Sequence, residues 1–193
     1  LWPGLVSAAL HNRNRQVDDI RLFELGMVFK QDETTLHQTN QIAGLRTGTA
    51  VRTQWTDSAR ETDFYDIKQD IESLLQTLHQ GKVTFHPVIY PALQRGQTAA
   101  IVGNGQTLGH VGALHPTIGA QLGFDKPLFL FQISCDILSF ADGAQFQPIS
   151  KFPAVRRDLA VVVDEQVSAA RCMEVTREAA GELLRDLQLF DVY

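Results

Sequence analysis

The chain has 193 residues, a formal net charge of −5 and an apolar share of 44%, which is ordinary for a globular protein. No apolar run approaches the roughly 18 residues that cross a bilayer. Proteins that bind nucleic acid over their whole surface are usually basic, so any such contact here needs a local basic patch. Cys135 and Cys172 form no CxxC pair, which excludes a disulfide framework and a cysteine zinc site and favours a reducing compartment, the cytoplasm.

Apolar residues at helical spacing predict a first helix within residues 1–15. Strands are predicted over 21–29 and, weakened by two glycines, over 42–51. The clearest helix runs from Asp63 to His79, with apolar residues at steps of three and four. Gly81 is its expected C-terminal cap.

Short strands follow over 83–89, 97–102 and 107–114, the last two joined by a turn at Asn104-Gly105. A short helix is predicted from Pro116 to near Gly123, and a buried strand over 128–135. Hairpin-connected strands with few helices indicate an α+β fold with an antiparallel sheet.

A second unit is expected after a polar linker at 139–148. It reads as a strand over 159–163 buried on both faces, a helix from Ser168 to Leu184 and a strand over 187–193. A unit of about 45 residues is near the lower limit for folding alone. We therefore expect either that this unit packs against the first unit or that the natural chain continues beyond Tyr193, and we favour the second.

Three acidic residues share one side of the predicted helix: Asp63, Asp66 and Asp70. They allow the hypothesis of a stand-alone metal-dependent enzyme. The alternative is a solvated border whose charge suits the helix dipole, and we favour it. No HExxH pair or nucleophile elbow is present, so no catalytic residue is predicted.

Lys151, Arg156 and Arg157 form a basic cluster before the apolar run at 159–163, opposed only by Asp158. Such a cluster beside a small sheet is suited to phosphate contacts. The alternative is an ordinary solvated entrance to a strand. Residues and spacing alone therefore leave an α+β protein without a resolved activity.

Several segments, in order, resemble the C-terminal part of the beta subunit of bacterial phenylalanine–tRNA ligase. They are 5–15 with 21–29 (RLFELGMVF), 63–68 (DFYDIK), 91–93 with 96–99 and 108–116 (LGHVGALHP), 149–160 (ISKFPAVRRDLA) and 189–193 (LFDVY). Gln94-Arg95 departs from the His-Pro usual in that family, and Gln69 from a common glycine, which puts only local turns in doubt.

The resemblance implies a class II synthetase-like core over 1–146, followed by the first half of a ferredoxin-like anticodon-binding domain over 147–193. It implies an inactive core, since Phe29-Lys30-Gln31-Asp32 lies where active cores carry an arginine that clamps ATP, and lysine cannot form that planar clamp. In the ferredoxin-like order 4-1-3-2, the first two strands would lack the third between them, and exposed edges invite disorder.

The resemblance further implies a non-catalytic piece of the subunit that supports assembly with the catalytic alpha subunit in an α2β2 ligase and tRNA(Phe) binding. Lys151, Arg156 and Arg157 are then the expected tRNA contacts. The chain itself is expected to bind no cofactor or metal, while the parent enzyme uses ATP and Mg²⁺. A pure protein-interaction scaffold remains an alternative.

Overall fold

The computed structural model describes residues 1–32, 34–51, 54–55, 58–78, 83–138 and 151–192. The chain divides into two compact units, Leu1–Ala144 and Gln145–Tyr193. The predicted linker and Gly81 lie outside the described residues. Within the described residues, no helix is both long and apolar enough to cross a bilayer.

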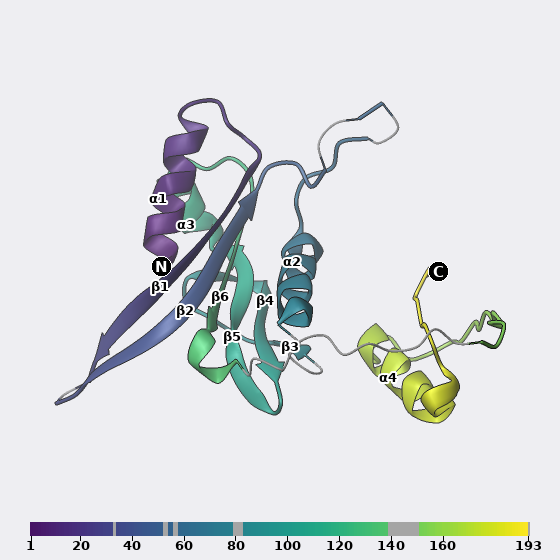
Figure 1. The fold of residues 1–193 in the computed structure, drawn as a ribbon. Coiled ribbons are helices and arrows are strands. Elements are labelled where there is room, and N and C mark those ends of the chain that lie inside the picture. The colour runs from purple at the N-terminus through teal and green to yellow at the C-terminus, as the bar shows by residue number, and fades with distance from the viewer. Residues whose placement is uncertain (33, 52–53, 56–57, 79–82, 139–150, 193) are drawn as a thin grey trace. The chain divides into compact units, whose positions relative to one another are not determined.

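The first unit is built on a six-stranded antiparallel sheet in the order β1-β2-β6-β5-β4-β3 (Figure 1). The strands are β1 (Ile20–Gln31), β2 (Leu36–Thr47), β3 (Val83–Pro87), β4 (Leu93–Gly103), β5 (Gln106–Leu114) and β6 (Leu128–Ser134). Asn104 and Gly105 both have positive φ in the β4–β5 turn, as Asn-Gly predicts. The prediction of an α+β fold with an antiparallel sheet is therefore confirmed.

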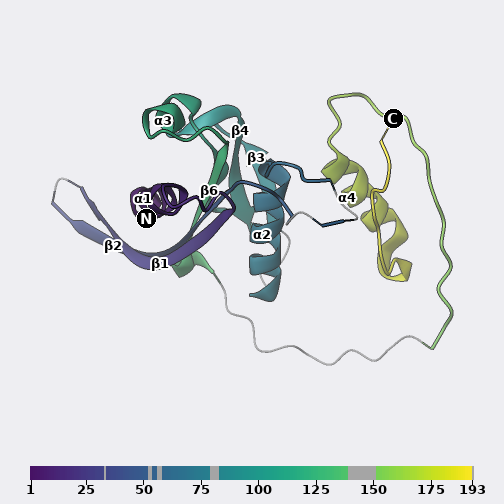
Figure 2. The ribbon, with the colours of Figure 1, turned by 90° about the horizontal axis from the view of Figure 1, so that it is seen from above.

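Helices cover both faces of this sheet (Figure 2). Helix α2 (Phe64–Thr77) packs Ile67, Ile71 and Leu75 on one face, which we call the first core. Helix α1 (Trp2–Arg13) packs Leu5 and Ala9 on the other, the second core. A short helix, α3 (Pro116–Gln121), follows β5, and a 3-10 turn, Cys135–Ile137, follows β6.

The β1–β2 hairpin extends beyond the rest of the sheet. β6 pairs with β2 only from Gln41 to Thr47, whereas β1 pairs with β2 along the whole of both strands. The segments Met27–Gln31 and Leu36–Asn40 therefore form a two-stranded ribbon, to which no third strand pairs among the described residues. A two-stranded ribbon by itself is marginally stable in water.

The second strand begins and ends earlier than its predicted span of 42–51. Its end is set by Gly48, whose φ is +91° and where a Cβ would lie 2.3 Å from the Asp18 carbonyl oxygen. Its polar beginning, Leu36–Asn40, belongs to the projecting ribbon and therefore carries no buried alternation that would reveal a strand.

The second unit contains one α-helix among its described residues, α4 (Ala169–Ala180), capped by the Ser168 hydroxyl and followed by a 3-10 turn at Gly181–Leu183. The predicted strands over 159–163 and 187–193 are wrong where the structure describes them: residues 153–164 and 187–192 form neither strand nor helix. The expected burial of the first is also wrong, since Val162 is fully exposed. A strand needs a hydrogen-bonded neighbour, and the described residues of this unit supply none to either segment.

Candidate interaction surfaces

The edge strand β1 presents a row of exposed apolar side chains. Phe23, Leu25, Met27 and Phe29 are 77%, 68%, 47% and 58% exposed, and we call them the β1 stripe. They share one face because side chains alternate along a strand. Leu22, the residue before Phe23, faces the other way and packs against the second core.

The β1 stripe continues the face covered by α2. Leu25 lies opposite Ile42 of β2, which packs against the first core, and Phe23 lies opposite Gly44. At Gly44 a Cβ would lie 2.2 Å from a ring atom of Phe131, a first-core residue. Large contiguous apolar patches are rare on monomeric proteins and mark interaction sites. The stripe is therefore the main candidate functional surface of the first unit.

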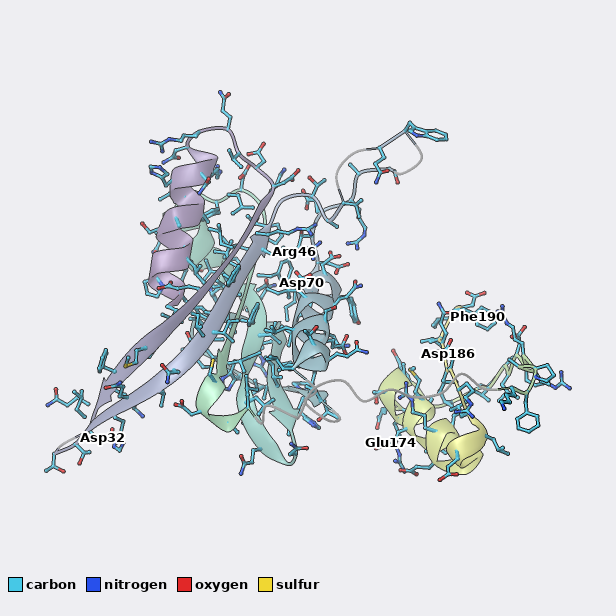
Figure 3. All side chains as sticks on the ribbon, in the orientation of Figure 1. Asp32, Arg46, Asp70, Glu174, Asp186 and Phe190 are labelled. Atoms are coloured by element: carbon cyan, nitrogen blue, oxygen red, sulfur yellow. The ribbon has the colours of Figure 1, made fainter. Side chains whose placement is uncertain are left out.

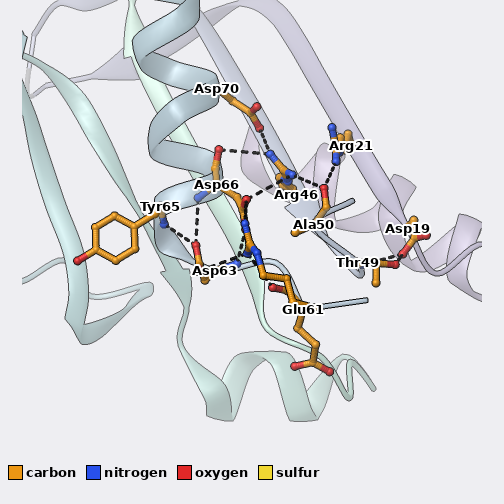
Figure 4. Close-up of polar contacts among 11 residues, drawn as sticks. Asp19, Arg21, Arg46, Thr49, Ala50, Glu61, Asp63, Tyr65, Asp66 and Asp70 are labelled. Carbon is orange, nitrogen blue, oxygen red and sulfur yellow. Dashed lines mark hydrogen bonds and ion pairs between the residues drawn. The ribbon is translucent and has the colours of Figure 1, made fainter. Parts of the chain in front are cut away.

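Two arginines, one on β2 and one in the segment before α2, form ion pairs with the start of that helix (Figure 4). Arg46 of β2, buried apart from 8% of its side chain, lies 2.9 Å from Asp70 and 3.7 Å from Asp66. Arg60 donates two hydrogen bonds of 2.7 Å to the Asp66 carboxylate. Figure 3 shows Arg46 and Asp70 beside each other where β2 meets the helix.

The three predicted acidic residues therefore serve as helix cap and ion-pair partners. Asp63 accepts from the backbone N–H groups of Tyr65 and Asp66, while Asp66 accepts from that of Asp63. The hydrogen bonds from Arg60 lower the pKa of Asp66 to about 2. Among the described residues, no group of three or more acidic, histidine or cysteine side chains is arranged to hold a metal. The metal-dependent enzyme hypothesis thus loses its site, because arginines already occupy the carboxylates.

Lys30, which the resemblance places where an ATP-clamping arginine was expected, lies exposed on the projecting ribbon, opposite His37. Near it, the Asp32 carboxylate lies 3.1 Å from the His37 imidazole, and Figure 3 places Asp32 at the tip of the ribbon.

The basic cluster lies in the irregular part of the second unit. Lys151, Arg156 and Arg157 are all exposed. Arg156 lies 3.4 Å from Asp158, and Arg157 donates to the Arg156 carbonyl. Residues 151–192 contain no strand that would form the expected sheet edge, so the cluster is an extended cationic segment.

Comparisons with known proteins define the class. Residues 1–135 match the family described as "Phenylalanyl tRNA synthetase beta chain CLM domain", and residues 150–193 match "Ferredoxin-fold anticodon binding domain". The first match covers most of the chain, which therefore belongs to the phenylalanyl-tRNA synthetase beta chain family.

Individual relatives share the name "Phenylalanine--tRNA ligase beta subunit". The chain is 42% identical over 193 residues to that of Methylococcus capsulatus (strain Bath), 43% over 194 to that of Pseudomonas syringae pv. tomato, and 40% over 193 to that of Hahella chejuensis. Each match covers 100% of this chain and 24% of the relative. The chain thus spans about a quarter of these relatives. The matches do not confirm the predicted C-terminal position within the subunit.

Proposed function

We propose that the chain is a non-catalytic part of a phenylalanine–tRNA ligase beta subunit, whose β1 stripe packs against the catalytic alpha subunit of an α2β2 enzyme. The main evidence for this proposal is the β1 stripe itself, a row of exposed apolar side chains on an edge strand of an otherwise well-packed sheet. Membership of the beta chain family supports the choice of partner. The parent enzyme would act in the cytoplasm, joining phenylalanine to tRNA(Phe) with ATP and Mg²⁺.

In this proposal residues 1–146 are an inactive copy of a class II synthetase core. The antiparallel sheet with helices on both faces is compatible with such a core. Lys30 supports inactivity, since a lysine on an exposed ribbon offers no planar clamp to a triphosphate. Residues 147–193 would be the first half of the anticodon-binding domain, in line with the match over 150–193.

The stripe is tested by binding to the alpha subunit of a phenylalanine–tRNA ligase. Replacing Phe23 and Leu25 together by Ser should weaken binding at least about 100-fold, because buried aromatic and aliphatic anchors dominate interfaces. Ile89→Ser is the matched control, since Ile89 is 70% exposed and lies outside the stripe. Equal binding by the double variant and the unchanged chain would refute the proposed interface.

The second part of the proposal is that Lys151, Arg156 and Arg157 contact the tRNA backbone. Their exposure and shared charge support phosphate contacts. With about three phosphates neutralised, log Kd against log salt should have a slope of magnitude about 2–3. Replacing all three by Ala should abolish low-salt tRNA binding. Replacing Arg171, Arg177 and Arg185 by Ala removes the same charge from the same unit and should leave binding in place.

A further inference from the structure

A small cavity lies on the α1 face of the sheet, away from the β1 stripe. Its volume is about 210 Å³. Strands β2, β5 and β6 contribute to its walls, together with Trp2 of α1 and Tyr90 of the segment between β3 and β4. Pockets for drug-sized ligands occupy roughly 300–1,000 Å³, so this cavity suits a ligand of one or two rings.

The walls of this cavity are uncharged. Its lining, drawn from the described part of the chain, contains no Asp, Glu, Lys or Arg. Burial lowers the pKa of His110 and so favours its neutral imidazole. A charged group inside a cavity needs a compensating charge, which is lacking here. The lining therefore selects against phosphate, carboxylate and ammonium groups.

An unpaired hydrogen-bond acceptor lies in this wall. Gln41 Oε1 is buried and has no hydrogen-bond partner among the described residues, while its Nε2 lies 3.4 Å from the Thr39 hydroxyl. Ser134 of β6 is paired with Gln41 of β2, and Gln132 of β6 is paired with His110 of β5. Carboxamides both donate and accept, which matches the edges of nucleobases. A ligand that donates to Gln41 Oε1 would relieve a costly unpaired group.

Flat rings stand beside these amides. The Trp2 and Tyr90 ring centroids are 5.5 Å apart, and those of Tyr90 and His110 are 4.9 Å apart. The Trp2 indole N–H donates to the Phe131 carbonyl at 2.9 Å, which fixes the ring in place. Aromatic side chains held in this way form stacking surfaces for bases.

We propose that this cavity binds one uncharged nucleobase, stacked on the Tyr90 ring and hydrogen-bonded to the carboxamides of Gln41 and Gln132. The base would come from a free nucleoside or from an unpaired nucleotide of an RNA. This site is independent of the β1 stripe and of the basic segment, so its failure leaves the proposed function untouched.

The test is saturation-transfer NMR on the full 193-residue chain with adenosine, guanosine, cytidine and uridine, and with ribose as a sugar control. We expect transfer to the base protons of at least one nucleoside, with a Kd on the order of millimolar for so small a ligand. Gln41→Leu should weaken binding about fivefold or more. Gln38→Leu, an exposed position on the same strand outside the cavity, should leave it unchanged.

Three results would overturn the proposal: no transfer to any nucleoside, equal transfer to ribose, or equal weakening by Gln38→Leu. If Gln41→Leu fails to fold, Gln132→Leu, which removes the other carboxamide of the proposed site, provides the second variant, with the same expected loss. A tetranucleotide of the preferred base distinguishes the sources. Tighter binding that Gln41→Leu removes assigns the site to RNA, whereas binding equal to that of the nucleoside assigns it to a free nucleoside.

Discussion

Replacing Asp66 by Asn tests whether the ion pairs at the start of α2 hold that helix to the hairpin. The Asp66 side chain is 7% exposed and accepts two hydrogen bonds from Arg60. The variant would leave the buried Arg46 with Asp70 as its remaining carboxylate partner. Breaking a buried ion pair costs about 3–5 kcal/mol, and the surviving Asp70 contact reduces the expected loss in free energy of unfolding to about 2–3 kcal/mol.

The lowered pKa of Asp66 predicts the direction in which folding stability changes with pH. The pKa of Asp66 is about 2 in the folded chain, against an ordinary value of 3.8. A pKa difference of about 1.8, at 1.36 kcal/mol for each pKa unit, corresponds to about 2.4 kcal/mol of folding stability. Because Arg60 is 54% exposed and screened by solvent, we expect about 1 kcal/mol. A lowered folded pKa stabilises the fold above the unfolded pKa. This contribution should therefore disappear as pH falls from about 5 to 2.

The assay is urea unfolding followed by tryptophan fluorescence, since Trp2 contacts Tyr90 inside the first unit. Asp63→Asn is the matched control: it removes one charge from the same helix start, and Asn caps helices as well as Asp does. The stability difference between Asp66→Asn and the unchanged chain should shrink by about 1 kcal/mol between pH 5 and pH 2. Equal losses for both variants, or a difference independent of pH, would refute the assigned ion pairs.

Three further outcomes follow from the packing. Gly44→Ala should lower the free energy of unfolding by about 1–3 kcal/mol in the same urea assay, because the new methyl group meets the Phe131 ring, and adding Phe131→Leu should restore part of it. Gly109→Ala should cost more and resist such rescue, because its methyl group would lie 1.9 Å from the Gln132 carbonyl oxygen. Val162→Asp should change the melting temperature of the first unit by less than about 2 °C, since Val162 is fully exposed; a larger change would show that this segment packs.

The sequence predicted the first unit well because its signals were local. The apolar spacing of Ile67, Ile71 and Leu75 and the cap at Asp63 located α2 to within two residues at its C-terminal end. Asn104-Gly105 located the β4–β5 turn. By contrast, the apolar run at 159–163 indicates a strand whatever surrounds it, and only the three-dimensional structure shows that the described part of the second unit offers no strand to pair with it.

The candidate surfaces were harder to predict. The pattern of Phe23, Leu25, Met27 and Phe29 indicated a strand, but their exposure depends on β1 lying at the sheet edge beyond the reach of α2. Arg46 gave no signal at all, because its acidic partners are 20 and 24 residues away along the chain. The cavity beside Tyr90 could not be predicted either, since residues from three strands, a helix, a 3-10 turn and a loop line it.

The ribbon formed by Met27–Gln31 and Leu36–Asn40 has a reach that follows from its length. At about 3.4 Å per residue, its free end stands about 17 Å past the last residue that pairs with β6. A bound protein can contact the ribbon without contacting the other strands of the sheet. The bound protein would pack against the ribbon and restrict its motion. We therefore expect the backbone amides of the ribbon to exchange more slowly in the complex than in the isolated chain.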